Sequence, residues 1–162
     1  MYNEQSLLKE LEKMGIRYEY ISHPPVFTSE QANAAMPQMT GAHCKNLFVK
    51  DRTGQKWLLT IPDDRKADLK QVAEKIGSKR LSFCDSDELM ECLVVTPGSV
   101  TPLAIINDRH HRVTMIMDQT IIDWGMVRCH PMINTATISM TVDDFKKFIT
   151  SMGHDLRIIK LV

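Results

Sequence analysis

The chain of 162 residues is 43% hydrophobic and 25% charged, which is typical of an ordinary soluble globular protein. Twenty lysines and arginines balance twenty aspartates and glutamates, and a zero net charge argues against a large nonspecific nucleic-acid binder. No stretch approaches the roughly 18 apolar residues of a membrane-spanning helix, so we expect no membrane association. The length fits one domain, which we expect to extend over residues 1–162.

The first half of the chain predicts helices that alternate with short strands. Leucines at helical spacing followed by Gly15 indicate a first helix, and the capping pair Thr28 and Gln31 indicates a second. Two apolar segments flank the turn at residues 51–54 and predict a β-hairpin. The expected elements are a helix over 6–14, a strand over 18–21, a helix from 28 or 29 to 35, strands over 43–50 and 56–61, and a helix over 68–76.

The second half of the chain is richer in strands. Residues 103–106 and 113–117 flank a polar turn, and we expect them to form a second hairpin. Thr141 with Asp144 three residues later predicts a capped helix that ends before Gly153. The other expected elements are a short helix from 85 or 86 to 92 and strands over 135–140 and 156–161. Hairpins mixed with helix-separated strands favour an α+β fold with a mixed sheet over a regular βαβ repeat.

Four cysteines bear on the cellular compartment and on catalysis. No C-x-x-C pair occurs and no apolar leader follows the polar first residues, so we expect reduced thiols in a cytoplasmic protein. Cys44 follows His43 and Cys129 precedes His130, arrangements that could activate a thiolate nucleophile. Neighbouring strand residues point to opposite faces, however, and small buried thiols are the simpler interpretation.

The usual catalytic signatures are absent from the sequence. The histidines lack the close spacing of a zinc site, and neither a phosphate-binding glycine loop nor a G-x-S-x-G elbow occurs. We therefore expect no metal and no other cofactor. Lys45 stands out inside an apolar strand, because a lysine there is costly unless an anionic partner or substrate compensates its charge. The alternative is an edge-strand lysine whose ammonium group reaches water.

Two polar segments complete a candidate site with Lys45. Residues 97–102 form a rigid loop in which Gly98 lets another backbone approach closely, so its N–H groups could hold a ligand. His130-Pro131 and Asn134-Thr135 form a second polar cluster just before a strand. The alternative is that both segments are structural loops.

These segments carry a resemblance to a known family. The run Lys45-Asn46-Leu47, the loop Gly98-x-x-x-Pro102 and the run His130-Pro131-x-x-Asn134-Thr135-Ala136-Thr137 together resemble the prolyl-tRNA editing-domain family, which includes the YbaK proteins and a domain inserted in many prolyl-tRNA synthetases. Order and spacing match from about residue 7 to the end of the chain. The strings at 67–70, 96–102 and 106–108 look closest to the stand-alone branch that removes alanine from proline tRNA.

The resemblance implies a single compact α+β domain with a mixed, partly barrel-like β-sheet flanked by helices. It also implies hydrolysis of an aminoacyl ester without a metal or a covalent nucleophile. Lys45 matches the essential lysine of the family, and Asn46 and Arg80 match positions for substrate positioning and acceptor-stem contact. The other implied substrate-binding residues are Gly98, Ser99, Val100, Thr101, Pro102 and His130.

The implied partner is a mischarged tRNA, bound through its acceptor end and terminal adenosine, with prolyl-tRNA synthetase as a further candidate. We expect a monomer. We expect alanyl-tRNA for proline to be the substrate, and two alternatives stay open. One is removal of cysteine from the same tRNA, and the other is a catalytically silent tRNA-binding module, against which the presence of Lys45 argues.

Overall fold

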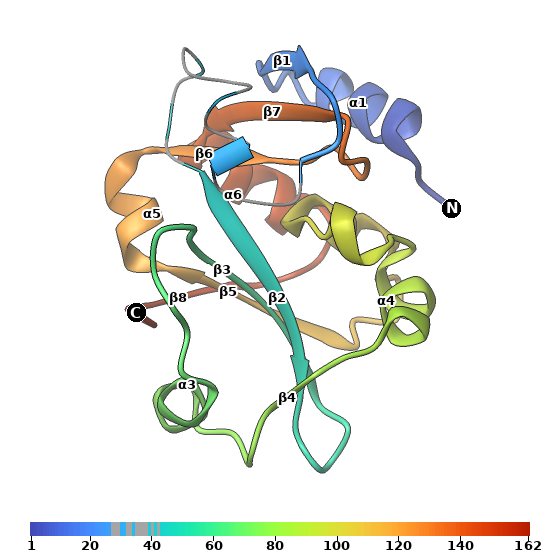
Figure 1. Cartoon of the computed structure of the whole chain (residues 1–162). Coiled ribbons are helices and arrows are strands. Elements are labelled where there is room, and N and C mark those ends of the chain that lie inside the picture. The colour runs from blue at the N-terminus through green and yellow to red at the C-terminus, as the bar shows by residue number, and fades with distance from the viewer. Residues whose placement is uncertain (27–29, 32–33, 35–38, 40, 42) are drawn as a thin grey trace.

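A five-stranded mixed sheet forms the centre of the computed structural model, which describes residues 1–26, 30–31, 34, 39, 41 and 43–162 (Figure 1). Its strand order is β4-β2-β3-β5-β8. The strands are β2 (Cys44–Lys50), β3 (Lys56–Pro62), β4 (Ser82–Phe83), β5 (Val113–Asp118) and β8 (Leu156–Ile159). Strand β2 is antiparallel to both β3 and β4, whereas β5 pairs in parallel with β3 and with β8. The hairpin predicted for residues 43–61 is therefore confirmed.

A smaller antiparallel sheet lies above one end of β2 (Figure 1). It contains β1 (Glu19–Ser22), β6 (Met126–Cys129) and β7 (Ala136–Thr141), in the order β1-β7-β6. An isolated parallel bridge between His43 and Arg128 joins the start of β2 to this sheet. The N-terminal end of β2 therefore meets the smaller sheet, while its C-terminal end runs toward the turn at residues 51–55.

Helices cover both faces of the large sheet. They are α1 (Glu4–Lys13), α3 (Leu69–Ile76), α4 (Ser86–Leu93), α5 (Gln119–Trp124) and α6 (Val142–Ser151), with the 3-10 helices η1 (Pro97–Ser99) and η2 (Pro102–Asn107). Successive residues of a strand point to opposite faces, and the core divides accordingly. Phe48 and Leu58 pack into a large cluster with α1, α4, η2 and α6, whereas Val49 and Leu59 pack against α3 on the other face.

Helix ends follow the capping signals in the sequence. Asn3 and Ser6 form a capping box at the start of α1, and Asp85 and Glu88 form another at the start of α4. Asp68 caps α3, which ends at Gly77 in the left-handed conformation that glycine tolerates best. The predicted helix from 28 or 29 to 35 has both of its candidate N-cap residues, Thr28 and Ser29, and most of its length outside the described residues.

The α+β class is confirmed, but the described strands form two open sheets and no closed barrel. The expected second hairpin is wrong as well. Residues 102–107 form η2, because Thr101 caps the segment and the side chain of the buried Asn107 bonds to the carbonyl of Leu93. Strand β5 then pairs in parallel with two strands distant in sequence. Every helix in the described part of the chain is too short or too polar to span a bilayer.

Candidate functional site

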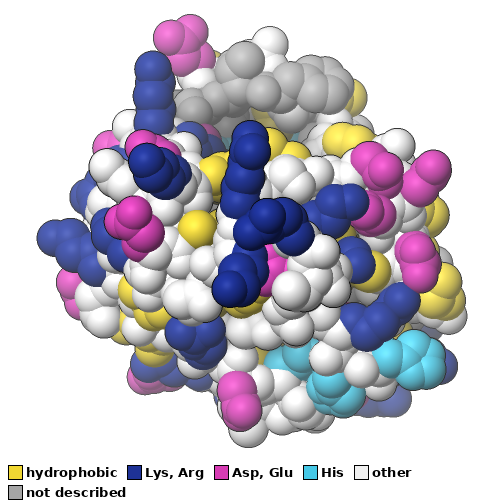
Figure 2. All heavy atoms as spheres, turned by 90° about the horizontal axis from the view of Figure 1, so that it is seen from below, with side chains coloured by type: hydrophobic (Ala, Val, Ile, Leu, Met, Phe, Trp, Pro, Cys, Tyr) yellow, Lys and Arg dark blue, Asp and Glu magenta, His cyan; other side chains and the backbone are white. Residues whose placement is uncertain are grey.

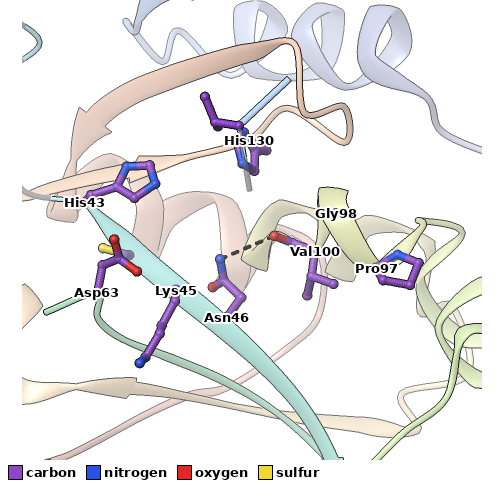
Figure 3. A pocket seen from close by; sticks show the side chains of 10 residues that line it. His43, Lys45, Asn46, Asp63, Pro97, Gly98, Val100 and His130 are labelled. Carbon is purple, nitrogen blue, oxygen red and sulfur yellow. Dashed lines mark hydrogen bonds between the residues drawn. The ribbon is translucent and has the colours of Figure 1, made fainter. Parts of the chain in front are cut away.

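The N-terminal end of β2 borders a cavity of about 330 Å³. Ligand sites in proteins commonly have volumes of roughly 300–1,000 Å³, so this one suits a small group such as the end of a larger substrate. Its described lining residues are Val26, His43, Cys44, Lys45, Asn46, Asp63, Pro97, Gly98, Val100 and His130 (Figure 3). The fold therefore brings together β2, the end of β3, the loop around η1 and the segment after β6.

The cavity unites five of the nine residues predicted for the site. These are Lys45, Asn46, Gly98, Val100 and His130. Ser99, Thr101 and Pro102 are buried and do not line it. Thr101 instead accepts a hydrogen bond from the backbone N–H of Leu103, so its side chain stabilises the start of η2.

Arg80 lies away from the cavity. It is exposed between α3 and β4, in a groove that it shares with Lys50 and Arg52. Lys50 is the last residue of β2 and pairs with Ser82, so Arg80 lies toward the end of this strand opposite the cavity. Figure 2 shows lysines and arginines gathered across the face seen from this lower end of the molecule.

Asn46 ties β2 to the glycine-containing loop. Its amide nitrogen donates to the carbonyl of Val100 at 3.3 Å (Figure 3), and its carbonyl oxygen accepts from the hydroxyl of Thr60 at 2.7 Å. Thr60 is the cross-strand partner of Asn46 on β3. Because both ends of the amide are bonded within the protein, Asn46 holds the loop at a fixed distance from β2.

Lys45 is half-buried, and its ammonium group makes no hydrogen bond or ion pair in the part of the chain that the structure describes. Figure 3 shows its side chain on the opposite side of β2 from Asn46, as expected for neighbours in a strand. A partly desolvated cation without a protein partner is free to bind an anion or ribose oxygens of a ligand.

Three histidines gather beside the cavity. The ring of His130 lies 6.1 Å from that of His23 and 6.4 Å from that of His43, measured between centroids. Burial lowers the pKa of His43 to about 4 and also lowers the pKa of His130. Both imidazoles are therefore neutral at pH 7. His130 Nδ1 lies 2.9 Å from the carbonyl oxygen of Ala136 and donates to it, which leaves Nε2 as an acceptor.

The sequence interpretation missed His43 and Asp63 as members of the site. The sequence predicts no more for His43 than a candidate partner for Cys44 and a histidine too far from the others to bind zinc, and it predicts no role for Asp63. The signal that could have found them is their placement, since His43 precedes Lys45 by two residues and Asp63 follows the strand paired with β2. The backbone N–H of Asp63 donates to the carbonyl of His43 at 3.1 Å, which fixes both residues at the cavity.

The cysteines do not supply a nucleophile. None of the four forms a disulfide, and burial raises the pKa of Cys44 to about 12 and that of Cys129 as well. A buried thiol with a raised pKa is inert at neutral pH, in agreement with the simpler interpretation of both residues. Within the described residues, no group of three or more histidines, cysteines, aspartates or glutamates is placed to hold a metal ion.

The free energy of unfolding should fall as the pH drops from about 6.5 toward 4. His43 has an ordinary pKa of 6.5 when unfolded and about 4 when folded, so the unfolded chain binds a proton that the folded protein excludes. This difference destabilises the protein by about 2 kcal/mol at pH 5 relative to pH 7.5. Urea unfolding at both pH values measures it. The variant His43→Gln should lose that part of the pH dependence, and equal pH dependence in both proteins would contradict the prediction.

Comparison with known proteins agrees with this geometry. Residues 23–148 match the model of a family described as the aminoacyl-tRNA editing domain. The chain is 33% identical over 159 residues to the prolyl-tRNA editing protein ProX of Acetoanaerobium sticklandii, covering 98% of this chain and 97% of the relative. It is 39% identical over 160 residues to prolyl-tRNA synthetase associated domain-containing protein 1 of Xenopus laevis, covering 96% and 95%.

A solved structure of a candidate trans-editing enzyme for prolyl-tRNA synthetase shares the fold, with a TM-score of 0.72, 17% identity and coverage of 99% of this chain and 98% of that one. The fold and the site thus define a small α+β editing domain. The chain belongs to the aminoacyl-tRNA editing domain family, in its prolyl-tRNA editing group. The resemblance drawn from the motifs at Lys45, Gly98 and His130 is confirmed.

Proposed function

We propose that this protein is a trans-editing deacylase that hydrolyses the ester of mischarged proline tRNA, with alanyl-tRNA for proline as its substrate. The observation that carries the proposal is the unpartnered ammonium of Lys45 beside a small cavity, within the described chain. The relative named a prolyl-tRNA editing protein aligns over nearly the whole chain, which supports proline tRNA as the substrate. In this proposal, residues 1–162 form a single editing domain.

Hydrolysis of an aminoacyl ester requires little activation. The ester is already reactive, so the site has to place a water molecule near the carbonyl carbon and stabilise the developing oxyanion. Lys45 anchors the terminal adenosine through its phosphate or ribose oxygens, and backbone N–H groups near Gly98 polarise the ester. One well-placed oxyanion donor contributes roughly 3–4 kcal/mol to transition-state stabilisation. The ribose 2′-hydroxyl of the substrate orients the water.

Steric exclusion accounts for selection of a small side chain. Val26 and Val100 line the cavity, and Val26 packs against the buried Met39. An apolar pocket discriminates by only ~1–3 kcal/mol per methylene when it selects for size, but it excludes larger groups by clash. Alanine fits such a pocket, and the string from Gly98 to Pro102 favours alanine over cysteine by its resemblance.

The remaining contacts extend the proposal to the tRNA body. Arg80, in its basic groove with Lys50 and Arg52, is available to phosphates of the acceptor stem at a distance from the cavity.

The protein acts as a cytoplasmic monomer, with prolyl-tRNA synthetase as a second partner. Zero net charge predicts modest affinity for tRNA that weakens further as salt increases.

Release of labelled amino acid tests this function directly. We expect rapid release from alanyl-tRNA for proline and little above spontaneous hydrolysis from alanyl-tRNA for alanine, because the tRNA is also selected. Cysteinyl-tRNA for proline is the third substrate. Faster release of cysteine would keep the chemistry and change the specificity, while no release from any of the three would favour a silent binding module.

A further inference from the structure

Two buried polar atoms at the cavity lack a partner among the described residues. They are Nδ1 of His43 and Oδ2 of Asp63, and both residues line the cavity. A buried polar atom left without a hydrogen bond costs roughly 1–3 kcal/mol, and native proteins leave few of them. Two such atoms on neighbouring residues of one cavity indicate a ligand group that bonds to both.

The chemistry of these atoms selects the ligand group. Among the described lining residues, Asp63 supplies the carboxylate and Lys45 the ammonium, while the imidazoles of His43 and His130 are neutral at pH 7. A carboxylate oxygen only accepts hydrogen bonds, and one nitrogen of a neutral imidazole accepts as well. The complementary group is a cation with several N–H donors.

An aminoacyl ester carries such a cation. Its α-amino group titrates near neutral pH and, when protonated, has three N–H donors. Lys45 would repel this ammonium, whereas Asp63 would attract it. A substrate with a phosphate near one end and an ammonium at the other thus matches a cavity with a lysine and an aspartate in its wall.

We propose that Asp63 and His43 form a subsite that binds the α-ammonium group of the aminoacyl ester. The subsite rests on the proposed function and adds to it the requirement for a free α-amine. The bond from the Asp63 N–H to the His43 carbonyl holds the two side chains side by side, as Figure 3 shows. Asp63 Oδ2 and His43 Nδ1 then each accept one N–H of the ammonium.

This subsite would separate mischarged tRNA from tRNA that carries a growing peptide. The nitrogen of a peptidyl or N-acylated ester is a neutral amide with one N–H and an added acyl group, so it cannot satisfy both acceptors. It would also leave Oδ2 of Asp63 buried without a hydrogen bond, which costs roughly 1–3 kcal/mol. The protein would therefore cleave free aminoacyl esters and spare N-blocked ones.

The experiment compares alanyl-tRNA for proline with its N-acetylalanyl counterpart, using wild type and Asp63→Asn. A hydrogen bond to a charged group contributes roughly 1.5–3 kcal/mol, so we expect Asp63→Asn to slow cleavage of the free amine about 10- to 100-fold. Its residual rate on the N-acetylated substrate should stay within about threefold of wild type on this reasoning. The preference for the free amine would then collapse. Asp64→Asn is the matched control, since Asp64 is the exposed neighbour and should keep the wild-type preference.

Equal slowing of both substrates by Asp63→Asn would overturn the subsite and leave Asp63 with a structural role. An unchanged preference for the free amine would overturn it too. Thermal unfolding of each variant checks that the fold is retained.

A binding measurement keeps this inference separate from the proposed hydrolysis. The probes are 3′-alanylamino-adenosine, an uncleavable amide, and its 3′-propionylamino analogue, which lacks the amine. We expect wild type to bind the alanyl probe more tightly by calorimetry and Asp63→Asn to bind both alike. If wild type prefers the alanyl probe but hydrolyses no tRNA, the subsite is supported and the deacylase is rejected. If wild type hydrolyses the tRNA but binds both probes equally, only the subsite is rejected.

Discussion

Replacing Lys45 by alanine is expected to lower the rate of alanine release from alanyl-tRNA for proline at least about 100-fold, a loss of the size seen when one preorganised donor is removed from an active site. The ammonium of Lys45 is the cation described at the cavity wall, and neither Asn46 nor His130 can replace its charge. Single-turnover kinetics at several enzyme concentrations measure both the loss of substrate anchoring and any loss of positioning at the chemical step. Lys45→Arg should recover only part of the rate, because a guanidinium is broader and planar.

The same substitution should not destabilise the fold. Lys45 is half-buried and makes no hydrogen bond or ion pair within the described chain, so its removal relieves a desolvation cost instead of breaking a contact. We expect the midpoint of thermal unfolding to stay the same or to rise, as is common for residues kept for function at the expense of stability.

Lys147→Ala is the control for the catalytic prediction, since Lys147 is an exposed cation on α6 that donates to the carbonyl of Met14 and lines neither the cavity nor the groove of Arg80. It should retain most of the rate. If Lys45→Ala hydrolysed alanyl-tRNA as fast as wild type, the proposed role of Lys45 would be wrong.

Local signals explain which parts of the fold could be predicted from the sequence. The α1 and α3 helices and the β2-β3 hairpin each carry their own caps, turn and periodicity within about a dozen residues. Their bounds shift by only a few residues, as when the first helix begins at Glu4 because Asn3 forms the cap. The parallel partners of β5 could not be read in this way, because β3 and β8 lie far from it in sequence.

The segment after η1 shows how a local pattern misled the prediction. Residues 103–106 are apolar and precede a polar turn, which is the pattern of a hairpin strand. Pro102 instead starts a 3-10 helix that buries its apolar residues. The side chain of Asn107 bonds to the backbones of Tyr2 and Leu93, and these contacts exist only in the folded chain. Short apolar runs fit either structure until such partners are known.

The residues of the candidate site also fall into two groups, those predicted from the sequence and those added by the structure. Motif resemblance located Lys45, Asn46, Gly98, Val100 and His130, and the fold brings them to one cavity. The unpartnered side-chain atoms of His43 and Asp63 can be recognised only in three dimensions, although the positions of both residues beside the predicted hairpin are visible in the sequence.

The second large effect is expected at Asp118, and it concerns stability instead of catalysis. Asp118 is fully buried at the end of β5. One carboxylate oxygen accepts from the N–H of Thr120 at 2.8 Å and so caps α5. The other accepts from the N–H groups of Leu161 at 2.7 Å and Val162 at 3.1 Å. One side chain therefore joins the sheet, a helix and the last residues of the chain.

Asp118→Ala should lower the free energy of unfolding by about 4 kcal/mol, since it removes a helix cap and leaves buried donors without partners. Urea unfolding followed by circular dichroism measures the change. Asp118→Asn keeps one acceptor oxygen and should lose about half as much by the same reasoning.

Asp123→Ala is a suitable control, because Asp123 is exposed on the same helix and accepts from the Gln119 side chain. Its stability should change by less than about 0.5 kcal/mol, as is usual for surface positions. A loss below about 1 kcal/mol in Asp118→Ala would mean that the chain end and α5 find other partners. Asp118 is not among the described residues that line the cavity. A large loss of stability with unchanged turnover per folded molecule would therefore show that Asp118 stabilises the fold and takes no part in hydrolysis.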